Sequence, residues 1–507
     1  MKNKEVTIEK HSGEEEKSPK IIVRCVGHEF FYPISDILRL FTGEIPRQEE
    51  ICVVCDAGAM ASSIDPSSSD LILVSSISED RVETYTEKGA PGEDPWRIFI
   101  DKEDMFLPPN REVKRQLYFL LSRLSGRAFP WGSLTGIRPT QVARELTSEE
   151  EMTNIYDVRK DKAHLAFLTR DREDLVLSGT DKDSLHVYIG IPFCPSRCAY
   201  CSFVAQEAPR KTALLPQYVD AVLSEMDMVL PRIEGKIETL YIGGGTPTVL
   251  SEALFEKFIK GVFSHKEFSA LKEICVEAGR PDTITEKKLQ VLLDAGVKRI
   301  CINPQTLCDR TLARVGRKHT AEDFEAAFEM ARKMGFSIIN TDLIAGLPGE
   351  TTEEFCDSLT RIIKLSPENI TVHSLSKKRR ASLSREEIVK QEKEELERIE
   401  KMLSFASENL LSSGYNPYYM YKQKDTLGGH ENVGYSKDGT ECVYNVAMMS
   451  DQRSVLSFGA GGMSKRVFFG SDDALHVRVE RCPCIKDPIQ YIAKVDEMTE
   501  KKIRFFS

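Results

Sequence analysis

The segment Cys194-Pro-Ser-Arg-Cys198-Ala-Tyr-Cys201 places three cysteines at spacings of four and three residues. It directly follows His186 to Phe193, an apolar run typical of a buried strand. Three thiolates in one short loop can each bind one iron of a four-iron cluster, leaving the fourth iron open to another ligand. A closed zinc site needs a fourth protein ligand, and no cysteine or histidine follows nearby. We therefore predict that these three cysteines hold an iron–sulfur cluster.

From residue 186 onward, apolar β-type runs alternate with amphipathic helical patterns. The predicted strands are His186 to Phe193, Ile237 to Ile242, Glu273 to Ala278, Lys298 to Asn303, Ser337 to Ala345 and Asn369 to Leu375. The predicted helices are Leu215 to Met228, Glu252 to Val262, Glu286 to Leu293, Ala321 to Lys333 and Glu353 to Ile363. Strand–helix units in succession favour parallel strands joined by right-handed crossovers. The predicted fold class is α/β, a partial (β/α)6 barrel of the TIM type, with its chemistry at the C-terminal ends of the strands.

Four regions are predicted along the chain. Residues 1–20 are charged and poor in apolar side chains, as in a mobile tail. Residues 21–180 are predicted to form an N-terminal α+β domain of unknown role, opening with a β-hairpin over residues 21–32. The barrel occupies 181–383. A C-terminal α/β region, 384–507, begins with a charged helix and is expected to cover the substrate.

The composition excludes several classes of protein. The chain has 507 residues, which predicts two or three domains. Lysine and arginine number 69 against 79 aspartates and glutamates, and the net charge of −10 argues against a general nucleic-acid surface. The 13 cysteines, without a signal peptide or a membrane-length apolar run, favour a reducing, cytoplasmic location and no membrane partner.

The second and third predicted strands end in residues suited to a polar ligand. Gly243-Gly-Gly-Thr-Pro-Thr248 follows the second strand, where glycines let the backbone approach a ligand closely. Glu277 ends the third strand, and a carboxylate there suits hydroxyl groups that donate hydrogen bonds. Because parallel strands end at one edge, both segments are expected beside the cysteine loop.

The cysteine spacing resembles the loop of the radical S-adenosylmethionine (SAM) superfamily at each cysteine position. This resemblance implies a 4Fe–4S cluster whose open iron chelates the amino and carboxylate groups of SAM. The reduced cluster would cleave SAM to a 5′-deoxyadenosyl radical, so the cofactor would carry the difficult chemistry. The triple glycine would then bind the methionine part of SAM, and Glu277 its ribose.

A narrower resemblance, to the oxygen-independent coproporphyrinogen III oxidase family, runs over residues 186–350. Its signatures are Tyr188-Ile-Gly-Ile-Pro-Phe-Cys194, the triple glycine, Asn303-Pro-Gln305, Gly316-Arg-Lys-His319 and Asp342-Leu-Ile-Ala-Gly-Leu-Pro-Gly349. The implied contacts to SAM or its surroundings are Tyr188, Tyr200, Gly244, Gly245, Thr246, Glu277, Gln305, Arg317 and Asp342. Tyr188 is also the implied catalytic residue. Arg317 makes independent sense, since a guanidinium binds a carboxylate bidentately.

Two further motifs are similar to the longer HemZ branch of that family, the coproporphyrinogen dehydrogenases. They are Pro130-Trp-Gly-Ser-Leu-Thr-Gly-Ile-Arg-Pro139 and Gly429-His-Glu-Asn-Val-Gly-Tyr435, with Tyr418 to Lys424 before the second. The resemblance implies conversion of coproporphyrinogen III to protoporphyrinogen IX without oxygen, within heme biosynthesis. It also implies an electron donor such as flavodoxin or ferredoxin.

Two departures leave other functions open. The decarboxylases carry a fourth cysteine where Phe203 stands, and a histidine where Gly190 stands. The missing cysteine resembles the heme-chaperone branch, so one alternative is a protein that binds and transfers heme. A second alternative is another radical SAM enzyme acting on a tetrapyrrole.

Weaker features complete the set of candidates. The run Lys377 to Arg380 follows the sixth strand and is a candidate for binding propionates. The remaining cysteines, including the pairs Cys52/Cys55 and Cys482/Cys484, are interpreted mostly as core residues. The isolated histidines His319, His373 and His430 are interpreted as structural, with heme ligation as the alternative.

Overall fold

The computed structural model describes residues 21–42, 51–54, 71–87, 96–136, 138–201, 205–376, 392–423, 426–470 and 477–507. The chain divides into two compact units, Met1–Ala128 and Phe129–Ser507. The boundary expected from the sequence lay at residue 180. In the structure, α3 (Pro139–Glu145), α4 (Glu149–Tyr156) and α5 (Lys160–Ser178) belong to the second unit. They do so because α3 and α5 pack against β14 (Asn416–Lys422), far along the chain.

The first unit contains a five-stranded sheet in the order β2-β1-β3-β4-β5. Its strands are β1 (Ile21–Val26), β2 (Ile51–Val54), β3 (Leu71–Ile77), β4 (Arg81–Thr86) and β5 (Arg97–Asp101). The predicted hairpin over residues 21–32 is wrong. β1 pairs in parallel with both β2 and β3, and the chain after Gly27 enters α1 (Phe31–Thr42). Helix α1 forms because Ile34, Leu38 and Phe41 lie on one buried face, and it packs on α2 (Pro109–Ser125).

The second unit confirms the predicted α/β barrel of parallel strands. The strands are β6 (Leu185–Ile191), β9 (Ile237–Gly244), β10 (Glu273–Gly279), β11 (Arg299–Ile302), β12 (Ile338–Ala345) and β13 (Asn369–Ser374). Each pairs in parallel with its neighbour in chain order. A short pair, β7 (Phe193–Cys194) with β8 (Gln206–Glu207), flanks the cysteine loop.

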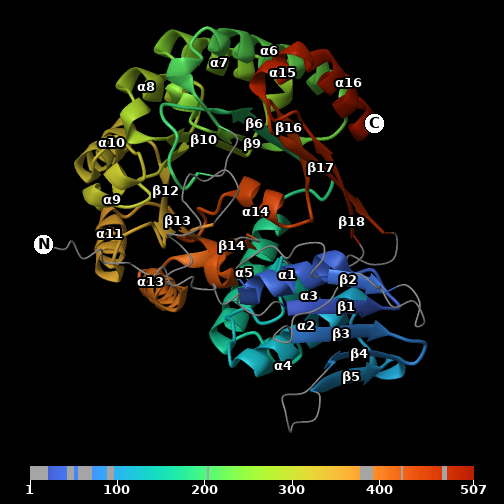
Figure 1. The fold of residues 1–507 in the computed structure, drawn as a ribbon. Helices are drawn as coiled ribbons and strands as arrows, with labels where there is room; N and C mark the ends of the chain where they lie inside the picture. Colours follow the sequence, from blue (N-terminus) through green and yellow to red (C-terminus); the bar gives the residue numbers. More distant parts are fainter. Residues whose placement is uncertain are drawn as a thin grey trace, which may run out of the picture. The chain divides into compact units, whose positions relative to one another are not determined.

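The crossover helices lie outside the curved sheet as an arc (Figure 1). They are α6 (Leu214–Val229), α7 (Glu252–Phe263), α8 (Glu286–Asp294), α9 (Asp309–Arg314), α10 (Ala321–Met334) and α11 (Thr352–Leu365). Capping boxes begin two of them. The Thr320 hydroxyl accepts from the Asp323 backbone N–H, and Thr351 does the same for Glu354. These caps fix the first residue of α10, which follows α9, and of α11, which follows the loop after β12.

The sheet continues beyond the six barrel strands on both sides and does not close. Its order is β14-β15-β13-β12-β11-β10-β9-β6-β16-β17-β18. The added strands are β14, β15 (Glu431–Ser436), β16 (Ser454–Phe458), β17 (Met463–Phe469) and β18 (Val477–Pro483). The remaining helices are α13 (Glu392–Ser412), α14 (Val443–Met449), α15 (Pro488–Ala493) and α16 (Val495–Phe506). Helix α14 lies on the side enclosed by the arc (Figure 1). Among the described residues, no helix combines the length and hydropathy needed to cross a bilayer.

Buried contacts of Glu431 join the motif at residues 429–435 to helix α5 and to the motif at residues 130–139. Lys162 Nζ donates to Glu431 Oε1 at 2.6 Å, and Trp131 Nε1 donates to Glu431 Oε2 at 2.6 Å. All three side chains are buried. Lys162 and the two hydrogen bonds offset the cost of burial and hold the pKa of Glu431 at about 2. The pair therefore ties α5 to the edge of the barrel sheet.

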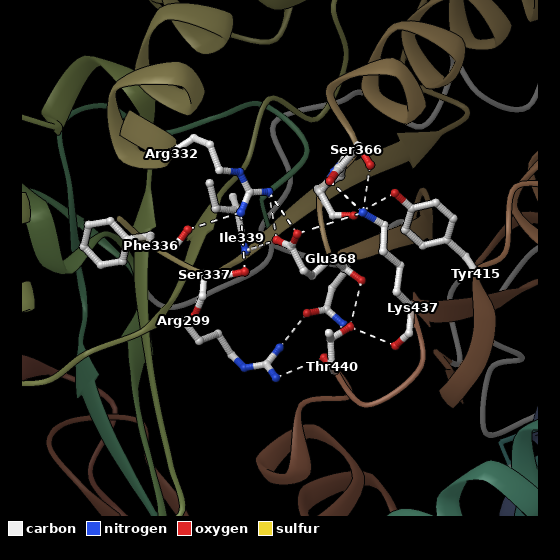
Figure 2. A network of polar contacts seen from close by, with 12 residues as sticks. Arg299, Arg332, Phe336, Ser337, Ile339, Ser366, Glu368, Tyr415, Lys437 and Thr440 are labelled. Carbon is white, nitrogen blue, oxygen red and sulfur yellow. Dashed lines mark hydrogen bonds and ion pairs between the residues drawn. The ribbon is translucent and has the colours of Figure 1, made fainter. Parts of the chain in front are cut away.

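A second polar network lies where β12 and β13 begin, at the end of the barrel opposite the cysteine loop (Figure 2). Glu368 accepts two hydrogen bonds from Arg332 Nη2, at 2.9 and 3.1 Å, and one from the Ile339 backbone. Arg299 donates to the Asn369 side chain and to the carbonyl of Thr440. These contacts connect α10, three strands and the turn after β15. In barrels of this kind, this end of the strands serves stability.

Replacing Lys162 with Met is expected to reduce the free energy of unfolding by about 3–5 kcal/mol, because Glu431 stays buried without its counter-charge. Denaturant unfolding followed by tryptophan fluorescence measures the loss. The matched control is Lys257→Met, which breaks the exposed Lys257–Asp220 pair and should cost less than about 1 kcal/mol. Equal losses in the two variants would contradict the assignment of Lys162 and Glu431 as a buried pair that ties the unit together.

Candidate functional site

The three cysteines of the predicted cluster loop lie at the C-terminal end of β6 and β7. Cys198 is buried, while Cys194 and Cys201 are half-buried. The loop is held by its own turn, in which the Cys201 N–H donates to the Cys198 carbonyl at 3.1 Å. It is also held from outside, since the Ala199 N–H donates to the Val315 carbonyl at 3.0 Å. The loop is therefore supported by the segment that follows α9.

The Cys194 thiol has a shifted pKa. Burial, with smaller contributions from the neighbouring Cys201 and Cys198, raises the pKa of this thiol to about 12. The three sulfurs thus lie near enough to interact electrostatically. Thr246 Oγ1 donates to Cys194 Sγ at 3.5 Å and favours the thiolate. Among the described residues, no three cysteine, histidine or carboxylate side chains could hold one metal ion together. Cluster ligands do not need to meet in this way, because each thiolate binds its own iron.

The glycines that end β9 are required by close backbone contacts. The Gly245 N–H donates to the Ile191 carbonyl, and the Thr246 N–H donates to the Phe193 carbonyl, both at 2.8 Å. A Cβ on Gly245 would lie 2.5 Å from the Phe193 carbonyl oxygen, so no side chain fits. Gly244 has φ +112°, which a side chain would disfavour. The triple glycine therefore brings the end of β9 against the strand that leads into the cysteine loop.

Glu277 lies at the end of β10, beside this glycine segment. Its Oε1 accepts from Tyr241 OH at 2.7 Å, and its Oε2 accepts from the Gly244 N–H at 3.1 Å. A Cβ on Gly243 would come within 2.7 Å of the carboxyl carbon. Burial raises the pKa of Glu277 to about 7, against the effect of these donors. The carboxylate is therefore fixed in direction before any ligand binds.

Tyr188 faces the interior of the barrel from β6 and is part of an aromatic stack. Its ring lies 6.3 Å from Tyr241 and 6.1 Å from Tyr444, and the latter two rings are 4.6 Å apart. A Cβ on Gly244 would lie 3.2 Å from the Tyr188 hydroxyl, so this tyrosine adjoins the glycine edge. Burial raises the pKa of the Tyr188 hydroxyl well above its ordinary value. Tyr188 is thus held as a neutral phenol beside Glu277 and the glycines.

Arg317 contacts Tyr200, which is itself a residue of the cysteine loop. Arg317 Nη1 donates to Tyr200 OH at 2.9 Å, and Nη2 donates to the Asn303 carbonyl at 2.5 Å. Arg317 is buried, and within the described part of the chain its Nε has no hydrogen-bond partner. A buried guanidinium with a spare donor is suited to a carboxylate ligand.

Gln305, in the segment after β11, is hydrogen-bonded to Asp342 within β12. The Gln305 N–H donates to the Asp342 carbonyl at 3.0 Å, and Gln305 has φ +70°, unusual for a residue with a side chain. Asn340 donates to Asp342 Oδ1 at 2.8 Å, and His373 Nε2 lies 3.6 Å from Oδ2. His373 Nδ1 in turn lies 3.2 Å from Tyr421 OH. His373, isolated in the sequence, therefore belongs to the same end of the barrel as Asp342.

The structure adds residues that the sequence analysis missed. Tyr241 and Tyr444 complete the aromatic stack, and Arg280 donates to Ser196 within the cysteine loop. The sequence did contain a signal for Arg280, because this residue directly follows the third predicted strand, at the end where the cysteine loop lies. It contained no signal for Tyr444, which comes from α14, far along the chain.

The positions of the other candidate residues are as follows. Lys377 to Arg380, Cys55 and Phe203 lie outside the described residues, and Cys52 lies in β2 with its side chain undescribed. His430 is buried with Nδ1 3.5 Å from Glu400, and His319 is buried near Arg317. Cys482 in β18 and Cys484 just after it are both buried.

The residues at this end of the barrel fit a cluster and SAM. The donor set is three thiols in one loop, with Thr246 within hydrogen-bonding distance of one sulfur. Beside it are a backbone edge that tolerates no side chains, a fixed carboxylate and a buried arginine with a spare donor. Hydroxyl, amino and carboxylate groups of a ligand would find partners there.

Comparison with known proteins gives matches over different parts of the chain. Residues 188–362 match the radical SAM superfamily. The oxygen-independent coproporphyrinogen-III oxidase-like protein HemZ of Bacillus subtilis (strain 168) is 36% identical over 416 residues, 78% of this chain and 81% of that protein. The heme chaperone HemW of the same organism is 37% identical over 193 residues, 37% of this chain and 49% of the chaperone.

Among solved structures, coproporphyrinogen III oxidase (HemN) from Escherichia coli has a TM-score of 0.46 and 21% sequence identity. The alignment covers 66% of this chain and 73% of that one. The sequence match to HemZ extends well beyond the barrel, whereas this chain spans about half of the length of the chaperone.

Replacing Cys198 with Ala is expected to abolish the brown absorbance of the reconstituted cluster, because two thiolates cannot hold three irons. Iron content and visible absorbance after anaerobic reconstitution provide the measurement. Cys356→Ala, which changes a half-buried cysteine on α11, is the control and should retain a full cluster. A full complement of iron in the Cys198 variant would refute the ligand assignment.

Replacing Gly243 with Ala is expected to weaken SAM binding about tenfold, the equivalent of one lost hydrogen bond, because the new methyl group displaces the Glu277 carboxylate from Gly244. Equilibrium dialysis of SAM against the cluster-loaded protein measures the affinity. Gly179→Ala is the control, since its Cβ would meet only the Val176 carbonyl at 3.4 Å. Unchanged affinity in the Gly243 variant would remove Glu277 from the proposed SAM site.

Proposed function

Because this chain belongs to the radical SAM superfamily, in the family of the coproporphyrinogen-III oxidase-like protein HemZ, we propose that it decarboxylates coproporphyrinogen III to protoporphyrinogen IX without oxygen. The observation that carries the proposal is the match to HemZ over most of both chains. The site supports it, since the three cysteines, the glycine edge and Glu277 meet at the C-terminal ends of neighbouring strands.

The family uses a 4Fe–4S cluster and SAM, with Cys194, Cys198 and Cys201 as the proposed ligands. When bound, these groups would supply a 5′-deoxyadenosyl radical able to remove a hydrogen atom from the β-carbon of a propionate. The proposed overall reaction would convert two propionates to vinyl groups with release of two molecules of carbon dioxide. It would need an electron donor of the flavodoxin or ferredoxin class and an acceptor for one electron per propionate.

The protein itself binds and orients the ligands and excludes water from them. Gly244, Gly245 and Thr246 are proposed to border the methionine part of SAM, with their own N–H groups bonded within the protein. Arg317 Nε, which has no hydrogen-bond partner among the described residues, is proposed to bind the SAM carboxylate. Glu277 accepts from the ribose hydroxyls and is kept in place by Tyr241. Gln305 and Asp342 line the same end from the next strands.

Tyr188 is the proposed catalytic residue. As a neutral phenol in a stack of three rings, it adds an aromatic wall beside the glycine edge, with its hydroxyl close to Gly244. Such a wall limits the access of water to reactive intermediates.

A heme chaperone is the second candidate, favoured by the 37% identity to HemW over 193 residues and by Phe203 in place of a fourth cysteine. That likeness covers 37% of this chain, whereas HemZ matches 78%. A different radical SAM reaction on a tetrapyrrole is the third.

One assay distinguishes the three candidates. The cluster is reconstituted anaerobically, and SAM, reductant and coproporphyrinogen III are added. We expect 5′-deoxyadenosine together with porphyrin products that have lost one and then two carboxyl groups, and neither in the Cys198→Ala variant. Deoxyadenosine without decarboxylation would contradict the oxidase proposal and favour the third candidate. Tight heme binding with neither product would favour the chaperone.

A further inference from the structure

Arg280 lies in a rigid turn immediately after β10. Its N–H donates to the Ala278 carbonyl at 2.7 Å, and its own carbonyl accepts from Thr283 Oγ1 at 2.8 Å. Lys288 Nζ donates to the carbonyl of Thr283 at 3.0 Å. The side chain of Arg280 is almost completely buried. A buried guanidinium on a fixed backbone has a fixed direction.

Asp282 binds one edge of that guanidinium. Arg280 Nε and Nη2 donate to the two carboxylate oxygens, each at 2.9 Å. This bidentate arrangement uses the flat, forked shape of arginine, which lysine cannot reproduce. It leaves the remaining nitrogen, Nη1, pointing away from Asp282.

The remaining nitrogen contacts the cysteine loop. Arg280 Nη1 donates to Ser196 Oγ at 2.9 Å, and it lies 3.8 Å from Cys198 Sγ, within hydrogen-bonding distance of a sulfur. Ser196 Oγ in turn donates to the Gly316 carbonyl at 3.2 Å. One guanidinium thus connects the turn after β10 to a proposed cluster ligand.

We propose that Arg280 is a positioning residue for the cluster loop and that its hydrogen bond to Cys198 Sγ sets the reduction potential of the cluster. The proposal rests on the cluster assignment made above. Reduction adds negative charge that spreads onto the thiolates, so an N–H donor and a positive charge at the sulfur favour the reduced form and raise the potential. Asp282 balances part of that charge.

The test is a redox titration of the reconstituted protein without substrate, with the reduced cluster followed by electron paramagnetic resonance. Arg280→Gln should shift the midpoint potential to a more negative value, because the donor at Cys198 and the positive charge are both lost. Ser196→Ala should leave the potential near that of the wild type. It removes the hydroxyl that binds Arg280 and the Gly316 carbonyl, but it keeps the contact of Arg280 with Cys198. Arg332→Gln, which breaks a paired arginine at the opposite end of the barrel, is the control and should not shift it.

Two outcomes would overturn the proposal: an unchanged potential in Arg280→Gln, or an equal shift in Ser196→Ala, which would make loop anchoring the cause. If the Arg280 variant fails to hold a cluster, Asp282→Asn provides the measurement. It leaves the guanidinium without its counter-charge and should raise the potential, and no shift or a fall would overturn the proposal. Failure of the wild-type protein to form a cluster would instead refute the proposed function.

Discussion

The pairing of β6 with β9 is the constraint on which the rest of the candidate site depends. Its register places Tyr188 opposite Tyr241 and Ile191 opposite Gly244. Two backbone hydrogen bonds continue beyond the strands and bring Thr246 to the sulfur of Cys194. A slip of one residue would turn Tyr188 to the outside of the barrel and separate Thr246 from the loop. Glycines hold this register, because any side chain on Gly245 would meet the backbone of Phe193.

Much of the second unit is predictable from local sequence. All six barrel strands and the five predicted helices lie close to their predicted positions, because buried parallel strands give apolar runs and covering helices have one apolar face. One of these helices, α10, begins with a capping box at Thr320. The cysteine loop, Glu277 and the glycine edge were expected to meet for a topological reason: parallel strands that follow one another end at the same edge.

Features that depend on distant parts of the chain were not predictable in this way. The partners of β1 are β2 and β3, so the local pattern over residues 21–32 predicted a hairpin where the chain forms parallel strand pairs and a helix. Helix α5 belongs to the second unit because Lys162 is paired with Glu431, a contact that no local pattern reveals. The role of Arg280 depends on one nitrogen left free by Asp282, which is a matter of side-chain geometry. The contribution of Tyr444 depends on the placement of α14 inside the arc of helices.

The strand order also has a consequence for how the protein is made. β6 has two neighbours, β9 and β16, and they are synthesised at very different times: β6 ends at Ile191, whereas β16 begins at Ser454. At translation rates of about 5–20 residues per second, the open edge of β6 waits on the order of 10–50 s for its second partner. The cysteine loop follows that strand directly, so the nascent chain passes through a period in which its thiols lie beside an unprotected sheet edge. Protection of the β6 edge until β16 has been synthesised is therefore a demand that this topology places on folding.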